Sequence, residues 1–290
     1  MNRAVLKVLD AGLGASFQDA GRHGWRRFGV PTSGAMDAHA AGMANRLLNN
    51  PPWAAVVEIL LQGAAFEALE ETWVALAGAD LLCNQPRWRA LRLAKGDFIH
   101  FSGPKNGLWA YLAVEGGFAA PHWLDSASTL APAGLGRPLQ KGDVLCRSGL
   151  EPRFALPRGI AGRMAPAREQ RDYTSPPPLR VWPGPQWEWF TPGARAAFFA
   201  QPWQVAAQSN RVGYRLAGEA LDAPTRSMVS EPVLIGSIQV PPGGQPLVIM
   251  RDGPTVGGYP KIGLIDPDDV DWLAQCHFHQ PVTFTPAGPA

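Results

Sequence analysis

The chain has 290 residues, of which 46% are apolar and 17% are charged, and its formal net charge is +2. Because this length exceeds the usual size of one hydrophobic core, we expect one large or two medium domains. The weak net charge excludes a long-range attraction for nucleic acid or an anionic membrane, so we expect neither as a partner.

Neither a membrane anchor nor a disulfide framework is expected. No run of about 18 apolar residues occurs, and the N-terminal segment lacks an apolar core followed by a cleavage site, which predicts a cytoplasmic protein. Cys83, Cys146 and Cys276 are far apart and have no CxxC spacing, which argues against disulfides and a thiolate zinc site. His277 and His279, placed on a terminal strand, lack a nearby third ligand, so we predict no metal site.

Short β-rich runs separated by glycine and proline predict a mainly β chain with a few short helices. The 32 glycines and 29 prolines punctuate these runs and do not form one low-complexity tract. We expect strands, in chain order, over residues 3–9, 73–77, 98–101, 109–114, 179–182, 204–207, 235–240, 246–250 and 282–284. Helices are expected over residues 36–48, from 188–190 toward Ala200, and over 267–276.

The first predicted helix carries signals at both ends. Ser33 or Asp37 can accept hydrogen bonds from the free amides at its N-terminus, and the sequence NNP at residues 49–51 marks its end. Asn45 lies eight residues after Asp37, close to the same face of the helix. Helix capping and contact with a ligand are both open roles for Ser33 and Asp37.

Residues 151–178 are the predicted boundary between two domains, residues 1–150 and residues 179–290. This segment contains five arginines, ends in three consecutive prolines and shows little apolar periodicity. Such a composition is typical of a linker or a long surface connection.

Residues 231–261 hold the most informative pattern in the chain. Two β-rich runs, 233–240 and 247–250, flank the sequence PPGG, which predicts a hairpin. A polar, glycine-rich loop follows, whose backbone amides can approach a ligand closely. Its candidate site residues are Asp252, Thr255, Gly257, Gly258, Tyr259 and Lys261. An ordinary turn with solvated side chains is the alternative.

A second polar cluster contains Arg211, Tyr214 and Arg215. On a strand, the two arginines would share one face and could each hold a carboxylate or phosphate through two hydrogen bonds. The chain has no phosphate-binding loop, nucleophile elbow or dinucleotide-binding motif, which disfavours the common nucleotidase, hydrolase and dehydrogenase classes.

Residues 18–51 and 231–261 together resemble the family of allophanate hydrolase subunit 2, KipA and component C of 5-oxoprolinase, a family similar to the carboxyltransferase region of urea carboxylase. The resemblance extends in order through VVEI at 56–59, LAGAD at 76–80, AYLAVEGGF at 110–118, GRPLQKGD at 136–143 and SNRVGYRL at 209–216. Family members usually have aspartate where this chain has Asn210, so a charge that could orient Arg211 is absent at that position.

The resemblance implies two cyclophilin-like β-barrel lobes and an ATP-dependent, amide-processing system. A partner similar to KipI or to component B of 5-oxoprolinase, together with component A, would complete the site. The favoured activity is cleavage of 5-oxoproline to glutamate, with ATP and Mg at a site shared with a partner. No biotin attachment sequence of the Met-Lys-Met type occurs, so we expect no covalent biotin on this chain.

The resemblance also assigns roles to individual residues. Arg211, Lys261 and Arg215 are candidates for stabilising negative charge, with Asp252 as a partner of the metal-nucleotide or of a substrate nitrogen. Gln239 and Tyr259 could orient the amide. The other candidate substrate contacts are Arg22, Ser33, Asp37, Asn45, Tyr214, Thr255, Gly257 and Gly258.

Two further hypotheses stay open. In the first, the chain is a carboxyltransferase subunit, which transfers a carboxyl group from carboxybiotin on another chain to urea or another amide. In the second, it is a KipA-like regulatory binder that antagonises a KipI-like inhibitor of a sensor kinase. Gene neighbours would separate these hypotheses from lactam cleavage.

Overall fold

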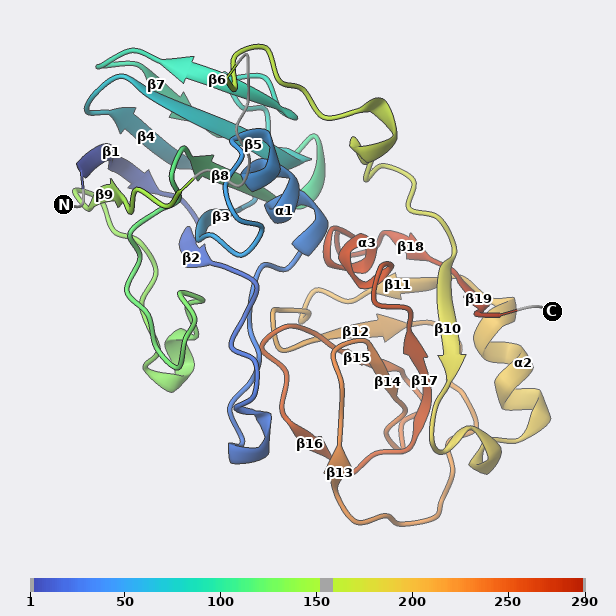
Figure 1. Ribbon diagram of the computed structural model, residues 1–290. Coiled ribbons are helices and arrows are strands. Elements are labelled where there is room, and N and C mark those ends of the chain that lie inside the picture. Colours follow the sequence, from blue (N-terminus) through green and yellow to red (C-terminus); the bar gives the residue numbers. More distant parts are fainter. Residues whose placement is uncertain (1–2, 152–158, 289–290) are drawn as a thin grey trace. The chain divides into compact units, whose positions relative to one another are not determined.

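The computed structural model describes residues 3–151 and 159–288, which form two compact units (Figure 1). Unit 1 comprises Met1–Arg22 and Ser33–Thr174, and unit 2 comprises His23–Thr32 and Ser175–Ala290. Within the predicted linker, residues 152–158 lie outside the described residues, and residues 159–174 belong to unit 1. None of the helices in the described ranges is long and apolar enough to cross a membrane.

The described part of unit 1 contains two antiparallel sheets, ordered β7-β4-β1-β9 and β2-β3-β8-β5-β6. Its elements are β1 (Arg3–Ala11), β2 (Ser16–Gln18), α1 (Ala38–Leu47), β3 (Val56–Leu60), β4 (Ala64–Ala68), β5 (Thr72–Asp80), β6 (Arg89–Leu93), β7 (Phe98–His100), β8 (Asn106–Val114), η2 (Ala131–Ala133), β9 (Val144–Arg147) and η3 (Ala167–Glu169).

The strands at the centre of unit 1 are buried on both faces. Helix α1 packs against β5 and β8, and the inward side chains of both sheets form a single core that includes Phe66, Leu76 and Leu112. The sequences of β5 and β8 are therefore nearly continuous apolar runs and do not alternate between apolar and polar residues.

The described part of unit 2 contains one eight-stranded sheet, ordered β18-β11-β12-β15-β14-β17-β10-β19, and a separate two-stranded ribbon of β13 and β16. Its elements are η1 (Arg26–Phe28), β10 (Leu179–Pro183), η4 (Trp187–Trp189), α2 (Pro192–Ala200), β11 (Trp203–Val205), β12 (Gly213–Ala217), β13 (Glu231–Pro232), β14 (Ser237–Gln239), β15 (Leu247–Ile249), β16 (Val256–Gly257), β17 (Lys261–Ile265), α3 (Val270–Ala274), β18 (Pro281–Val282) and β19 (Phe284–Pro286).

The large sheet of unit 2 curves into a nearly closed barrel. Strands β18 and β19 lie at opposite ends of the strand order, yet only Thr283 separates them in the sequence. Aromatic side chains pack together at this point, because the ring of Phe198 on α2 stacks on that of Phe284 at 4.8 Å and lies 6.0 Å from that of Trp203.

The predicted fold class, mainly β with a few short helices, is confirmed. The predicted hairpin is also confirmed, because β14 and β15 pair antiparallel. The helix predicted from residue 188 toward Ala200 is instead interrupted, because the Thr191 side chain accepts a hydrogen bond from the Ala194 amide at 3.1 Å and starts α2 anew with a proline at its first position.

Three other expectations differ from the structure. The helix predicted over residues 267–276 is limited to α3. The strand predicted over residues 282–284 divides into β18 and β19, because the chain passes from one end of the sheet to the other there. The segment with His277 and His279 is a turn, in which His279 has a φ of 65° and the Gln280 amide donates to the His277 carbonyl at 3.0 Å.

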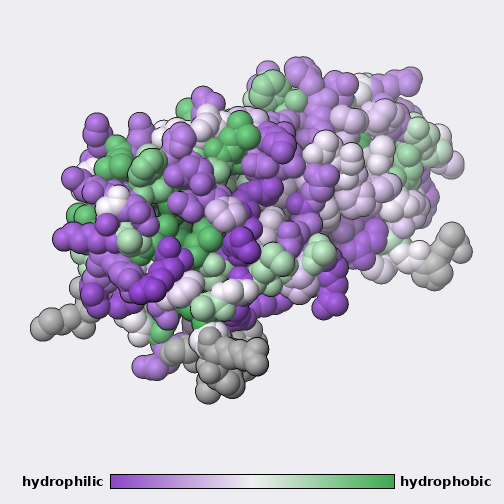
Figure 2. Space-filling view, turned by 90° about the horizontal axis from the view of Figure 1, so that it is seen from above, coloured by the Kyte–Doolittle hydropathy of each residue, from purple (hydrophilic) through white to green (hydrophobic). Residues whose placement is uncertain are grey.

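Fifteen large apolar residues among those that the structure describes are exposed. Figure 2 shows one face, on which hydrophobic residues form small groups between hydrophilic ones. The most exposed large apolar side chains include Val229, Trp53 and Phe28.

Candidate functional site

The pairing of β14 with β17 in unit 2 places Gln239 opposite Lys261. Both residues are buried, at 3% exposure each. A lysine is almost never this deeply buried unless its ammonium group has a partner. The register of the sheet therefore brings an amide and a buried cation together at one end of these strands.

The partner of the Lys261 ammonium is Glu231, which reaches it from the two-stranded ribbon. Gln186 links the two residues, since its Nε2 donates to Glu231 Oε1 at 2.8 Å and its Oε1 accepts from the Lys261 amide at 3.1 Å. The Lys261 side chain is 4% exposed and the Glu231 side chain is 35% exposed. We call Lys261, Glu231, Gln186 and Gln239 the Lys261 cluster.

The glycine-rich loop packs closely on this cluster. Gly257 pairs with Glu231 across the ribbon, and a Cβ atom at Gly257 would lie 2.3 Å from Gln239 Nε2. A side chain at this position would therefore displace the Gln239 amide group. Tyr259 is 44% exposed, and its backbone carbonyl accepts a long hydrogen bond of 3.5 Å from the Gln239 side chain. The Thr255 carbonyl accepts from the Val233 amide at 3.1 Å, and Gly258 is exposed.

Hydrogen bonds from Lys261, and then from Gln186, hold the pKa of Glu231 below its ordinary value of 4.5. Because the pKa of Glu231 is lowered in the folded state, its ionised form stabilises the fold. This stabilisation is fully present above the ordinary pKa of glutamate and is lost as the pH falls through the folded pKa. We expect the free energy of unfolding of Glu231→Gln, measured by urea titration between about pH 3 and pH 6, to fall less steeply with acid than that of the wild type. Coincident pH profiles would show that this ion pair does not form in solution.

Arg211 and Asp252 form a separate pair in unit 2. Arg211 Nε donates to Asp252 Oδ2 at 2.7 Å, and Nη2 donates to Oδ1 at 3.0 Å. The Asp252 side chain is only 7% exposed. Asp252 therefore supplies the orienting charge that is absent at Asn210. The strand register places Asp252 and Lys261 toward opposite ends of β14, so the structure does not gather Arg211, Asp252 and Lys261 at one point.

The expectation that Arg211 and Arg215 share a strand face is wrong. Strand β12 begins only at Gly213, and Arg211 lies in the preceding turn, where the Asn210 side chain accepts from the Val212 amide at 2.8 Å. Arg215 is exposed on the strand. Tyr214 is buried, and its hydroxyl donates to the Ala274 carbonyl at 2.8 Å.

The predicted site residues of unit 1 are all buried. Asp37 caps α1, as expected, by accepting from the Ala40 amide at 2.9 Å. Asn45 donates to the Ala54 carbonyl at 2.8 Å, and Arg22 donates to the Ser128 carbonyl. Ser33 does not cap the helix.

Ser33 instead adopts a left-handed conformation with a φ of 56°, and its buried hydroxyl has no hydrogen-bond partner among the described residues. Such a conformation is uncommon for a residue with a side chain. Both features keep Ser33 a candidate for contact with a ligand.

Sequence reasoning missed a buried network beneath the first helix. Glu58 Oε2 accepts from the Met36 amide at 2.7 Å and from the Tyr111 hydroxyl at 2.8 Å. The Tyr173 hydroxyl donates to Asp37 at 2.7 Å. Burial, reinforced by the charges of Glu58 and Asp37, holds the pKa of Tyr111 well above its usual value. A charged residue inside the apolar run VVEI was the available signal for this network.

Comparison with known proteins shows which family this chain belongs to. The chain matches the family described as carboxyltransferase domain, subdomain A and B, over residues 28–286. It is 36% identical to component C of the 5-oxoprolinase of Escherichia coli, over 97% of this chain and 90% of that protein. It is also 30% identical to urea amidolyase of Saccharomyces cerevisiae, over 91% of this chain but 16% of that protein.

Solved structures agree with this match. TTHA0988 superposes with a TM-score of 0.87 at 34% identity, over 98% of this chain and 55% of that chain. The urea carboxylase of Kluyveromyces lactis superposes with a TM-score of 0.87 at 26% identity, over 99% of this chain and 28% of that chain. This chain is therefore a member of the family of carboxyltransferase domains with subdomains A and B.

Proposed function

We propose that this chain is component C of an ATP-dependent 5-oxoprolinase, which cleaves 5-oxoproline to glutamate together with partner subunits. The observation that carries the proposal is the match to component C of the Escherichia coli 5-oxoprolinase over 97% of this chain and 90% of the relative. In urea amidolyase, by contrast, the matching region is 16% of a much longer protein.

The Lys261 cluster suits the chemistry of lactam cleavage. A lactam carbonyl is a poor electrophile, and activating it requires a cationic donor where negative charge develops on its oxygen. The Lys261 ammonium is such a donor, because burial in a low-dielectric environment strengthens its interaction with a nearby charge. The amide groups of Gln186 and Gln239 beside it can orient the N–H and C=O groups of a small amide. We assign Lys261 to charge stabilisation and the two glutamines to orientation.

The Arg211–Asp252 pair is the second candidate element of the site. A guanidinium that donates two hydrogen bonds to one carboxylate has a fixed orientation, which is the state required of a residue that positions a substrate. We propose that Asp252 acts by fixing Arg211.

ATP would supply the phosphoryl group that activates the lactam oxygen. The described residues contain no group of three or more His, Cys, Asp and Glu side chains that could hold a metal ion. We assign no step to a metal ion on this chain. We propose that ATP with Mg binds where a partner similar to component B of 5-oxoprolinase, or to KipI, completes the site, and that component A is the further partner.

Co-expression with these partners tests the proposal. We expect the purified single chain to show no 5-oxoproline-dependent ATP hydrolysis, and the co-purified complex to show it. A specific interface of this kind usually buries more than about 1,000 Å² in total, so the complex should elute together at micromolar concentration. Turnover by the single chain, with partner contamination excluded by mass spectrometry, would overturn the shared-site proposal. Separate elution of the proteins would overturn the choice of partner.

A carboxyltransferase is the second candidate, favoured by the description of the matching family and by the urea amidolyase relative. In that function Lys261 would stabilise charge on an amide that accepts a carboxyl group from carboxybiotin. Carboxylation of urea or another amide by this chain, in the presence of a biotin-carrying partner and without 5-oxoproline-dependent ATP hydrolysis, would select this function instead.

A further inference from the structure

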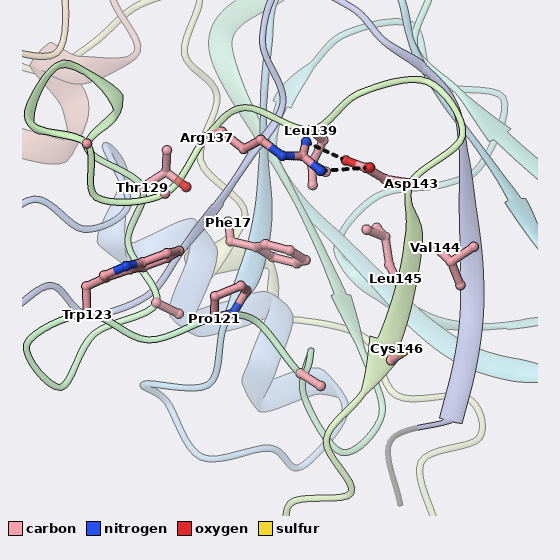
Figure 3. A pocket seen from close by; sticks show the side chains of 14 residues that line it. Phe17, Pro121, Trp123, Thr129, Arg137, Leu139, Asp143, Val144, Leu145 and Cys146 are labelled. Carbon is pink, nitrogen blue, oxygen red and sulfur yellow. Dashed lines mark hydrogen bonds and ion pairs between the residues drawn. The ribbon is translucent and has the colours of Figure 1, made fainter.

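We propose that a cavity in unit 1, between the edge strands β2 and β9, binds a small, uncharged, flat molecule that has a ring and one hydrogen-bonding group (Figure 3). The volume of the cavity is about 600 Å³, within the usual range of small-molecule sites. Its rim comes from the segment GRPLQKGD, which has no role in the proposed 5-oxoprolinase function.

Aromatic and aliphatic side chains form the walls of the cavity. Phe17 on β2, Leu145 on β9 and the ring of Trp123 all line this space (Figure 3). Gly136 has a φ of 81°, and a Cβ atom there would lie 3.3 Å from the Trp123 ring and 3.1 Å from the Thr129 hydroxyl oxygen. Glycine at this position therefore lets both groups sit close to the rim.

The rim is held rigid by an ion pair with two hydrogen bonds. Arg137 Nη1 donates to Asp143 Oδ2 at 2.8 Å, and Nη2 donates to Oδ1 at 2.9 Å. The Leu139 amide between them donates to the Ala15 carbonyl at 2.7 Å, which fastens the rim beside β2. The two opposite charges neutralise each other, so the cavity presents no net charge at this edge.

The part of the wall that contains Trp123 is a turn with strained backbone. Trp123 and Ser126 exchange backbone hydrogen bonds of 2.8 and 3.2 Å. The two residues between them, Leu124 and Asp125, have φ values of 53° and 62°, a conformation that favours glycine. Backbone strain of this kind persists only where surrounding contacts enforce it, and it concentrates at functional sites.

A half-buried carboxylate, that of Asp19, holds this turn. Asp19 accepts hydrogen bonds from the Ser126 hydroxyl at 2.7 Å, the Ala127 amide at 2.6 Å and the Ser128 hydroxyl at 2.5 Å. Both walls are thus formed before any ligand arrives. A preformed cavity loses little ordering entropy on binding, which favours affinity for a small molecule.

The lining determines the class of ligand. Apolar rings on two sides favour a flat ring compound, and the neutralised rim offers no unpaired charge to an ionic ligand. Thr129 is only 7% exposed, lines the cavity, and has a hydroxyl that no other described residue hydrogen-bonds. This hydroxyl is the group that would pair with a carbonyl or amine of the ligand.

Nile red, a neutral, flat dye with a carbonyl group, is a suitable probe for the purified full chain. We expect saturable binding with one site per chain by fluorescence titration. Ala119→Trp, which fills the cavity, should weaken binding at least tenfold, and Thr129→Val, which keeps the side-chain shape, should weaken it several-fold. Ala94→Trp, at an exposed position outside the cavity, should leave binding unchanged.

Cysteine alkylation provides a second measurement that does not depend on a variant. Cys146 lines the cavity, and Cys83 does not. Saturating Nile red should slow the reaction of N-phenylmaleimide with Cys146, mapped by mass spectrometry, and leave the reaction of Cys83 unchanged. Non-saturable binding, equal affinity in Thr129→Val and the wild type, or absence of protection at Cys146 would each overturn the proposal.

Discussion

Replacing Lys261 by methionine in the assembled enzyme is expected to lower kcat about a hundredfold or more. Removing one preorganised donor from a transition state usually costs about 2–4 kcal/mol. Methionine preserves most of the side-chain length, and the Glu231 side chain, at 35% exposure, stays partly solvated when its partner is lost. The measurement is steady-state, 5-oxoproline-dependent ATP hydrolysis by the complex, with partner binding followed by co-elution.

Matched variants separate a role at the site from a general effect. Lys105→Met removes an exposed ammonium whose side chain is 67% accessible, and Arg226→Ala removes a guanidinium that stacks on Trp189 at 4.5 Å. Both should retain normal turnover. Arg211→Ala should lower kcat about as much as Lys261→Met. Arg211→Lys should also lower kcat, because an ammonium cannot make the two parallel hydrogen bonds that the guanidinium donates to Asp252. Near-normal turnover of Lys261→Met, or an equal loss in Arg226→Ala, would show that the site has been misplaced.

Local chemistry made some features predictable. The sequence PPGG between two β-rich runs predicted the β14–β15 hairpin, because turn residues and strand propensity act over a few neighbouring positions. The helix cap at Asp37 was predictable for the same reason, since the Asp37 carboxylate accepts a hydrogen bond from the backbone amide only three residues later.

Contacts set by the register of the sheet could not be predicted. The partners of Lys261 in its cluster, Glu231 and Gln186, lie 30 and 75 residues away in sequence. Asp252 orients Arg211 from 41 residues away. No periodicity within a strand specifies which distant residue will face it, so the sequence could suggest Lys261 and Arg211 as candidates but could not show which residues hold them.

The same limit explains the missed network under α1. Glu58 lies in an apolar strand, and it accepts hydrogen bonds from Tyr111 on another strand and from Met36 in the segment before the helix. A sequence pattern shows that such a carboxylate is unusual, but it cannot show which buried groups satisfy it.

Glu58→Ala is expected to lower the free energy of unfolding by about 2–5 kcal/mol. The change leaves the Met36 amide and the Tyr111 hydroxyl buried without this acceptor, and each buried group left unsatisfied costs about 1–3 kcal/mol. Tyr111→Phe breaks only part of the network and should cost about 1–3 kcal/mol. Urea denaturation measures both changes.

A surface carboxylate gives the comparison that this prediction requires. Glu71 pairs with Arg92, and both side chains are about 60% exposed, so Glu71→Ala should change stability by less than about 1 kcal/mol. The contrast follows from desolvation, because water replaces the lost partner at Glu71 but cannot reach the donors around Glu58, which is 1% exposed. If Glu58→Ala and Glu71→Ala were equally mild, the donors around Glu58 would have found other acceptors, and this network would not be a major source of stability.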